Sequence, residues 1–199
     1  GVGSGVLMAV KKDRLLDHVL GTFSTVALSV PGFWIAIVLI FIFAEQWKIL
    51  PSSGISDGSG FILPAITLAL PSIGVCARLT RSAILDEIGR QYMTVADAKG
   101  MSRRRAVIRH AFGNALIPII TYLGNHMAGI IGGASIVETI FAIPGIGSYA
   151  IAGVQAKDYY VVQAYVLFSG CIYVLTNILI DLIYIALDPK IRAGEAVES

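Results

Sequence analysis

The side chain with the clearest potential for chemistry is a single histidine inside a long apolar stretch. His126 lies about eleven residues into the stretch 115–137, in the run Leu123-Gly124-Asn125-His126-Met127. Imidazole is a suitable ligand for Ni²⁺ and similar cations. His126 is therefore a candidate for lining a path by which a cation passes along the apolar stretch, and a candidate transient metal ligand. No firm metal site is predicted. A lone histidine in an apolar helix more often hydrogen-bonds a neighbouring helix in the bundle interior. Both interpretations stay open.

Catalytic signatures are absent from the sequence. It holds no GxxxxGK[ST] phosphate loop, no Ser/His/Asp arrangement and no HExxH motif, which predicts a non-enzyme that binds no cofactor and has no ATPase site. Cys76 and Cys171 lie in apolar stretches without a second cysteine or histidine at metal-ligand spacing, so we interpret them as packing residues. Asp181, near the end of the last apolar stretch, is interpreted as a packing or interfacial residue.

The elements that position these residues are predicted to be membrane-spanning helices. Hydrophobic residues make up 56% of the 199 residues and charged residues only 14%, whereas about 25% charge is usual for a soluble domain. Runs long enough to cross a bilayer predict four complete spans, at about 20–44, 61–80, 115–137 and 163–187. Pro31-Gly32 predicts a kink in the first span. The fold class is therefore an all-α polytopic membrane helix bundle.

The first ten residues are interpreted as part of a further span. The segment Gly1–Val10 is apolar, rich in glycine and too short to cross a membrane, and it has no initiating methionine. We expect it to be a partial transmembrane helix that ends at Lys11, which predicts that the sequence is a fragment of a longer protein.

Basic residues crowd into alternate loops between the apolar stretches. Of the 15 lysines and arginines, 13 fall on one predicted side of the membrane, and only Lys48 and Lys157 fall on the other. The positive-inside rule then predicts that residues 82–113, called loop 82–113 below, are cytoplasmic.

Gly129 and Gly133 form a GxxxG step. The step indicates primarily that two helices approach closely, and a role in lining a path through the membrane is the second interpretation.

Loop 82–113 is patterned like a pair of helices. Ile84, Ile88 and Tyr92 recur at i, i+4 and i+8, Gly100 interrupts the pattern, and Ser102 can cap a second helix. The loop carries a net charge of +3. Such an element could dock in a groove of a partner protein or lie on anionic lipid headgroups, and periodicity alone leaves both open. A nucleic-acid partner is not predicted, because the basic run is tethered between membrane spans.

The run from Tyr92 to Gly100 resembles the EAA loop of ABC importer permeases of the dipeptide/oligopeptide/nickel group. The family's Glu-Ala-Ala corresponds to Thr94-Val95-Ala96, so the glutamate is absent here. The resemblance continues in the expected order over essentially the whole chain, through residues 109–118, 138–147 and 158–163, Asn177, Asp181 and residues 187–192.

The resemblance implies a type I importer permease fold, with residues 1–199 forming one transmembrane domain fragment. A full-length member has six spans, so the first span and most of the second would be missing. Loop 82–113 would be the coupling element seated on an ATPase subunit, through Tyr92, Thr94, Val95, Ala96, Asp97, Ala98, Lys99, Gly100, Arg105 and Arg109. The outer loop would contain Glu138, Pro144, Gly145, Gly147 and Asp158, as a structural turn or near the point of substrate delivery.

The function implied by the resemblance is ATP-driven import by alternating access. The partners would be a second homologous permease subunit, two ATP-binding cassette subunits that carry ATP and Mg²⁺, an extracytoplasmic substrate-binding protein and the lipid bilayer of a bacterial or archaeal inner membrane. The cargo would be a peptide or nickel, and the stretch around His126 looks more like nickel-type members. The alternatives are a channel or exporter subunit not driven by an ATPase, and a membrane scaffold.

Overall fold

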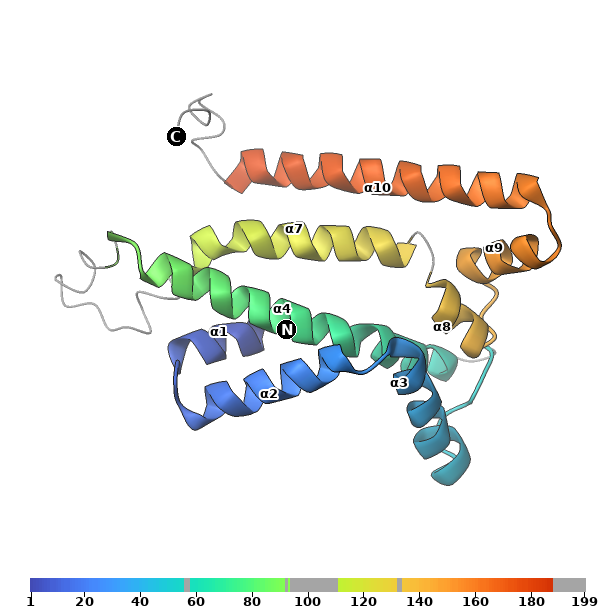
Figure 1. The fold of residues 1–199 in the computed structure, drawn as a ribbon, viewed down its shortest axis with the longest axis horizontal. Coiled ribbons are helices and arrows are strands. Elements are labelled where there is room, and N and C mark those ends of the chain that lie inside the picture. The colour runs from blue at the N-terminus through green and yellow to red at the C-terminus, as the bar shows by residue number, and fades with distance from the viewer. Residues whose placement is uncertain (56–57, 92, 94–110, 132–133, 188–199) are drawn as a thin grey trace. The chain divides into compact units, whose positions relative to one another are not determined.

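A computed structural model describes residues 1–55, 58–91, 93, 111–131 and 134–187. All regular elements in these residues are helical, which confirms the predicted all-α class. The chain forms two compact units, described separately here: unit 1 contains residues 1–119 and 136–143, and unit 2 contains residues 120–135 and 144–199. One helix, α7 (Phe112–Ile131), contributes residues to both units (Figure 1).

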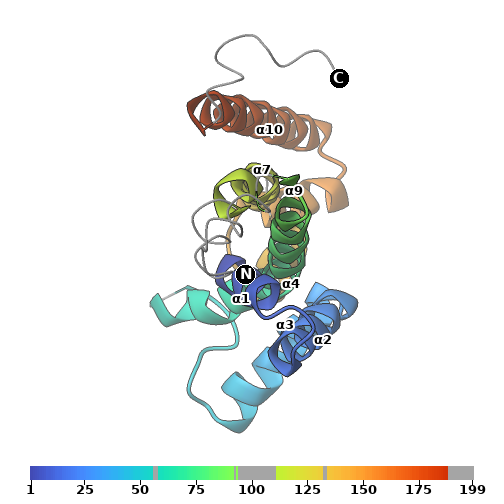
Figure 2. The same cartoon turned by 90° about the vertical axis from the view of Figure 1, so that its left-hand side faces the viewer.

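Unit 1 is built around one long helix. Its elements are α1 (Val2–Val10), α2 (Leu15–Ser29), α3 (Gly32–Leu39), the π-helical segment η1 (Ile40–Gln46), the 3₁₀ turn η2 (Gly58–Phe61), α4 (Ile62–Ile88), the start of α7, and most of α8 (Ser135–Ile140). Helices α1, α2 and α3 all pack against α4 (Figures 1 and 2). The first segment, predicted as a partial span, is thus a helix of nine residues.

Small residues allow these helices to approach closely. A Cβ atom on Gly5 of α1 would lie 2.5 Å from both the carbonyl oxygen of Ala77 and the Cβ of Thr80 on α4. A Cβ on Gly74 of α4 would lie 2.8 Å from the Ser24 carbonyl oxygen on α2. Helix pairs in membranes commonly depend on such contacts, because lipid provides no hydrophobic force between helices.

The predicted GxxxG contact is not made by its first glycine. A Cβ on Gly129 would meet nothing within 4 Å among the described residues, and Gly133 lies outside them. The role of the motif in helix packing therefore stays a prediction.

The predicted kink at Pro31-Gly32 is confirmed, and it is a break between two helices. The axes of Leu15–Ser29 and Gly32–Gln46 differ in direction by 98°, and Figure 1 shows the change of direction between α2 and α3. Val30 adopts an extended conformation, with φ −90° and ψ 126°. A residue before proline is pushed out of the helical region by the proline ring, so α2 ends there and a new helix begins.

Within the described part of the chain, two helices are long and apolar enough to cross a membrane. They cover Gly58–Ile88 and Tyr159–Ile185, and the bent pair would make a third span. The second predicted span, 61–80, corresponds to α4, which is long and apolar enough to cross a membrane but continues to Ile88 and so includes the start of loop 82–113. Helix α7 represents the predicted span 115–137, but it is not among these candidates. Asn114, Asn125 and His126 lower its hydropathy.

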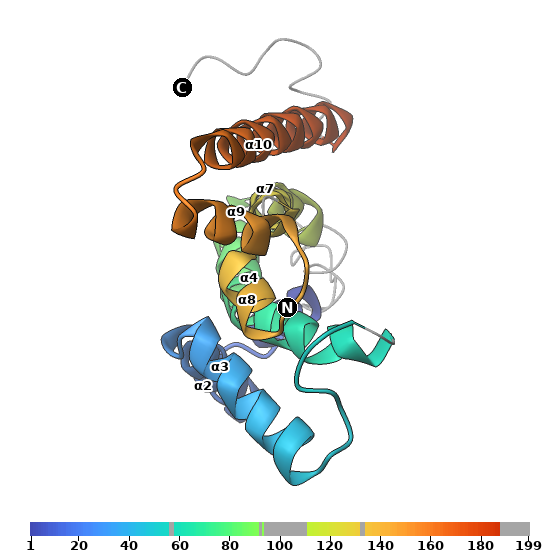
Figure 3. The same ribbon diagram turned by 90° about the vertical axis from the view of Figure 1, so that its right-hand side faces the viewer.

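Unit 2 contains α9 (Ile146–Gln155), α10 (Tyr159–Leu187) and the end of α7. Helix α9, which leads into α10 in Figure 3, lies within a segment that the sequence predicted to be an outside loop. A Cβ on Gly124 of α7 would lie 2.5 Å from the Cδ1 atom of Ile180 on α10, and the hydroxyls of Thr121 and Tyr184 are hydrogen-bonded. Most large apolar side chains of α10 are exposed within this chain, as expected for contact with lipid or other subunits.

Candidate functional site

The structure describes both ends of loop 82–113, and these ends form the candidate site. The loop base is defined here as residues 84–91, 93 and 111–119. Helix α4 ends at Ile88, where the N–H of Gly89 still donates to the Leu85 carbonyl at 3.2 Å. The chain returns at α7, which begins at Phe112.

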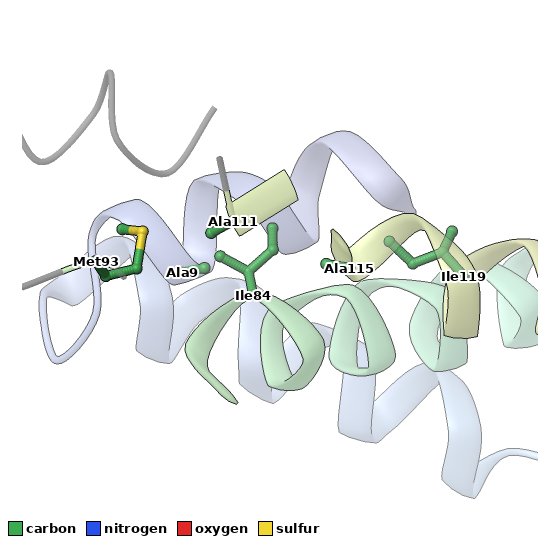
Figure 4. Packing of buried hydrophobic residues seen from close by; sticks show 6 residues of the cluster. All are labelled: Ala9, Ile84, Met93, Ala111, Ala115 and Ile119. Atoms are coloured by element: carbon green, nitrogen blue, oxygen red, sulfur yellow. The ribbon is translucent and has the colours of Figure 1, made fainter. Parts of the chain in front are cut away.

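An apolar cluster joins the two sides of the loop base. Figure 4 shows the Ile84 side chain of α4 pointing toward Ala111 and Ala115 at the start of α7. The cluster also contains a residue of α1, so three helices meet there. Its members are all less than 5% exposed: Ala9, Ile84, Met93, Ala111, Ala115 and Ile119.

A buried carboxylate lies one turn beyond Ile84. Glu87 is only 8% exposed. Its Oε2 atom accepts a hydrogen bond from Nδ2 of Asn114 at 3.1 Å, and its Oε1 atom forms an ion pair with Nε of Arg90 at 3.0 Å. Buried carboxylates need such partners because leaving water is costly for a charge. Glu87 therefore connects the outgoing and returning sides of the loop base.

A second buried carboxylate joins α2 to α4. Asp17 is 4% exposed, and its two oxygens accept from Nε and Nη2 of Arg81 at 2.7 and 2.8 Å. The backbone N–H of Asp13 adds a third hydrogen bond at 3.0 Å. Two parallel bonds from one guanidinium fix both distance and orientation. This pair ties the α1–α2 turn to α4.

An open cavity of about 430 Å³ lies beside this pair. It is lined by Met8, Asp17, His18, Gly21, Thr22, Thr25, Arg78 and Arg81. Arg78 is exposed and forms no ion pair with any described residue. The cavity is therefore an open depression at the predicted cytoplasmic end of α2 and α4, lined by both charged and apolar groups.

The predicted coupling residues lie outside the part of the chain that the structure describes. They are Tyr92, Thr94, Val95, Ala96, Asp97, Ala98, Lys99, Gly100, Arg105 and Arg109. Their roles stay predictions. The structure instead describes the loop base, from which the segment containing these residues extends.

His126 is partly buried on α7, where its ring stacks on Tyr122. The ring centroids are 5.7 Å apart and the planes differ by 8°. The Oδ1 atom of the adjacent Asn125 is buried without a hydrogen-bond partner among the described residues. No group of three His, Cys, Asp or Glu side chains in those residues is placed to hold a metal ion. The structure thus places the His126 ring against Tyr122, and a pathway role stays a prediction.

The predicted outer-loop residues occupy helix ends. Glu138 is on α8, and its carbonyl accepts from the Ile143 N–H at 2.8 Å. Pro144 precedes Gly145, which caps α9 and accepts from the Ser148 hydroxyl at 2.9 Å.

The other two outer-loop residues also have local contacts. A Cβ on Gly147 would lie 2.7 Å from the Ser135 Cα, so only glycine fits there without a shift. The Oδ1 atom of Asp158 accepts from the N–H groups of Tyr160 and Val161 at 3.1 and 3.3 Å, which makes Asp158 the N-cap of α10. These contacts are structural, and substrate delivery stays a prediction.

Sequence reasoning missed both carboxylate links. Asp17 and Arg81 are 64 residues apart, and Glu87 and Asn114 are 27 apart. A signal was present, because the predicted topology places each pair at the cytoplasmic ends of spans. A carboxylate and a hydrogen-bond donor predicted at the same membrane depth could have indicated each pairing.

Comparison with known proteins agrees with the resemblance. Residues 1–193 match the family described as "Binding-protein-dependent transport system inner membrane component". The chain is 40% identical to the probable peptide ABC transporter permease protein y4tP of Sinorhizobium fredii (strain NBRC 101917 / NGR234), over 96% of this chain and 64% of that protein.

Two further relatives have similar coverage. The dipeptide transport system permease protein DppB of Bacillus subtilis (strain 168) is 35% identical, over 96% of this chain and 62% of its own length. The glutathione transport system permease protein GsiC of Escherichia coli (strain K12) is 34% identical, over 96% of this chain and 63% of its own length. The chain therefore spans a little under two thirds of the length of these three relatives.

Proposed function

Because this chain belongs to the family of inner membrane components of binding-protein-dependent transport systems, we propose that it is a permease subunit of an ATP-driven importer. It would form half of a translocation pathway with a second, homologous permease subunit. Two ATP-binding cassette subunits would bind ATP and Mg²⁺, and an extracytoplasmic binding protein would deliver the cargo.

The observation that carries this proposal is the joined loop base. Loop 82–113 leaves from α4 and returns at α7, and both sides share one apolar cluster with α1. A displacement of this loop would move several helices, because they pack together at the loop base. If the two ends of the loop did not pack together, they could move separately and the displacement would not reach the other helices. This arrangement supports ATPase coupling through loop 82–113.

In the proposed mechanism, closure of the two ATPase subunits displaces loop 82–113. The displacement reaches α4 and α7 at the loop base and α1 through Ala9. The Asp17–Arg81 pair carries it on to α2. Access would then alternate between the two sides of the membrane as these helices move together.

A short peptide is the proposed cargo. The relatives described above are named for peptides, dipeptides and glutathione, which is itself a peptide. Nickel is the second candidate, and it rests on His126 alone. The two cargoes differ in one testable respect, because only nickel transport should depend on an imidazole ligand.

The test is reconstitution of the full-length protein with the permease and ATPase subunits encoded beside it. ATP hydrolysis and uptake would be measured with a binding protein loaded with a dipeptide, with glutathione or with Ni²⁺. Stimulation of both by a peptide-loaded binding protein supports the proposal. Stimulation by the Ni²⁺-loaded protein, lost in His126→Ala, would replace peptide by nickel as the cargo.

Gly100→Val tests the coupling role of the loop directly. A β-branched residue in a tight turn costs about 1–3 kcal/mol, so we expect coupled uptake to fall about tenfold or more. Gly170→Val in α10 is the matched control, because a Cβ on Gly170 would meet no described atom within 4 Å. Unchanged ATPase binding and uptake in Gly100→Val, measured on inserted protein, would refute this coupling role.

The alternatives from the sequence make different predictions in the same assay. A channel or exporter subunit would need no ATPase, and a scaffold would recruit a cytoplasmic protein without uptake. A stable membrane protein that recruits no ATPase would favour a channel, an exporter subunit or a scaffold over an importer.

A further inference from the structure

Glu87 lies at a position that no catalytic or binding motif explains. It is a charged residue with 8% of its surface exposed, beside the exposed Asp86 on the same helix. Acidic residues are almost never this buried unless they are paired. The burial therefore indicates that the Glu87 carboxylate has a positioning role.

The two oxygens of Glu87 are used on two different sides of the loop base. Oε1 pairs with Arg90, which follows the end of α4 on the outgoing chain. Oε2 accepts from Asn114, the third residue of α7 on the returning chain. Hydrogen bonds to a carboxylate are shorter and stronger than those between neutral groups. One side chain thus sets the separation of the two chain segments that carry the loop.

The apolar cluster supports this separation from a neighbouring position. Ile84 precedes Glu87 by three residues, so both side chains lie on nearly the same face of α4. Ile84 contacts the start of α7 through Ala111 and Ala115, as Figure 4 shows. Close packing resists compression, and the hydrogen bond to Asn114 resists separation.

We propose that Glu87 is a positioning residue for energy coupling, which holds the outgoing and returning sides of loop 82–113 together so that the loop moves α4 and α7 as one body. This inference rests on the proposed function. It predicts that breaking the Glu87–Asn114 bond uncouples ATP hydrolysis from uptake while leaving the ATPase subunits bound. Two sides that move independently would dissipate the displacement.

The experiment uses the reconstituted full-length complex and four variants. Asn114→Asp replaces the amide that donates to Glu87 by a second carboxylate, which repels the first. Glu87→Gln keeps an oxygen acceptor for Asn114 but loses the charge. The double variant Glu87→Gln/Asn114→Asp restores a hydrogen bond with reversed polarity, because the Gln amide can donate to the new carboxylate. Asp86→Asn is the matched control, since it removes an exposed neighbouring charge.

The measured quantity is cargo transported per ATP hydrolysed, at equal amounts of assembled complex. We expect Asn114→Asp to lower this ratio about tenfold, because loss of one hydrogen bond to a charged group costs about that much. In the double variant the ratio should recover to within about threefold of wild type. Glu87→Gln alone should lower it about threefold, since a neutral acceptor is weaker. Asp86→Asn should leave it unchanged. A merely structural role would lower the amount of complex and leave the ratio as in wild type.

The outcomes separate this inference from the proposed function. A wild-type complex that recruits no ATPase refutes the proposed function and the inference with it. A coupled wild-type complex in which Asn114→Asp keeps the wild-type ratio, or in which the double variant shows no recovery, refutes only the inference. If Asn114→Asp does not assemble, Glu87→Gln decides, and a ratio equal to that of Asp86→Asn overturns the proposal.

Discussion

Removing the arginine of the Asp17–Arg81 pair should loosen the packing of α1 and α2 on α4. Asp17 is 4% exposed and accepts two hydrogen bonds from Arg81, at 2.7 and 2.8 Å. In Arg81→Gln the buried carboxylate loses its counter-charge. Loss of one partner of a buried pair costs about 3–5 kcal/mol, and because the Arg81 side chain is 30% exposed we lower the expected value to about 2 kcal/mol.

A buried thiol provides the assay for this effect. Cys76 on α4 is 4% exposed and lies against Gly1, the N-cap residue of α1, since a Cβ on Gly1 would be 2.8 Å from the Cys76 Cβ. The exposed Cys171 and any cysteine outside these 199 residues are replaced by alanine, so that Cys76 is the remaining reactive site. Alkylation of Cys76 by N-ethylmaleimide in membrane vesicles then reports how often α1 separates from α4. A destabilisation of about 2 kcal/mol predicts alkylation about 30-fold faster in Arg81→Gln.

Two further variants make this prediction refutable. Asp17→Asn/Arg81→Gln replaces both charges by amides that can hydrogen-bond, so its alkylation rate should return to within about threefold of wild type. Arg78→Gln removes an exposed arginine on the same helix, and it should leave the rate unchanged. Equal rates in Arg81→Gln and Arg78→Gln would show that the pair does not hold α1 and α2 on α4.

Two other predictions concern helix packing and capping. Gly5→Val should destabilise the purified protein by about 1–3 kcal/mol, because its Cβ would overlap the Ala77 carbonyl and Thr80 on α4. A thermal melt compares this variant with Gly3→Val, where a Cβ meets no described atom within 4 Å. Equal melting temperatures of the two variants would contradict the packing argument. Asp158→Ala should destabilise the first turn of α10 by about 1 kcal/mol through loss of its N-cap, seen as faster hydrogen exchange in the segment that begins at Tyr160. Exchange as slow as in wild type would rule out the cap.

Much of the helix layout could be predicted from the sequence, because it depends on local patterns. Apolar runs predicted α4 and α10, and Pro31 predicted where the first span changes direction. The size of that change could not be predicted, because proline fixes only the backbone of Val30 and itself. The 98° angle also depends on how α2 and α3 each pack against α4.

The helix α9 and the contacts between helices were harder to predict. Residues 146–155 were read as part of a loop, although Gly145 and Ser148 form a helix start. The GxxxG pattern pointed to Gly129, whereas among the described glycines of α7 it is Gly124 that lies close to a neighbour, Ile180. Which glycine meets a neighbour depends on how the helix is rotated about its axis, and one sequence does not contain that rotation.

The loop base was only half predictable. Ile84 and Ile88 were correctly placed on a helix that enters loop 82–113. The hydrogen bond between Glu87 and Asn114 was missed, since Asn114 was read only as part of a family motif. Pairing across 27 residues depends on the fold between them.

The break at Pro31 also determines what can surround this part of the membrane domain. Helix α2 has 15 residues and a length of about 22 Å, shorter than the hydrocarbon core of about 30 Å, so a helix starting at one membrane face ends within the core. A straight helix would pair the Ala27 carbonyl with the N–H of residue 31, and proline has none. Lipid chains cannot solvate a free carbonyl. Water, or a polar group of this chain or of a neighbouring one, must therefore reach the bend, so lipid chains alone cannot surround this position.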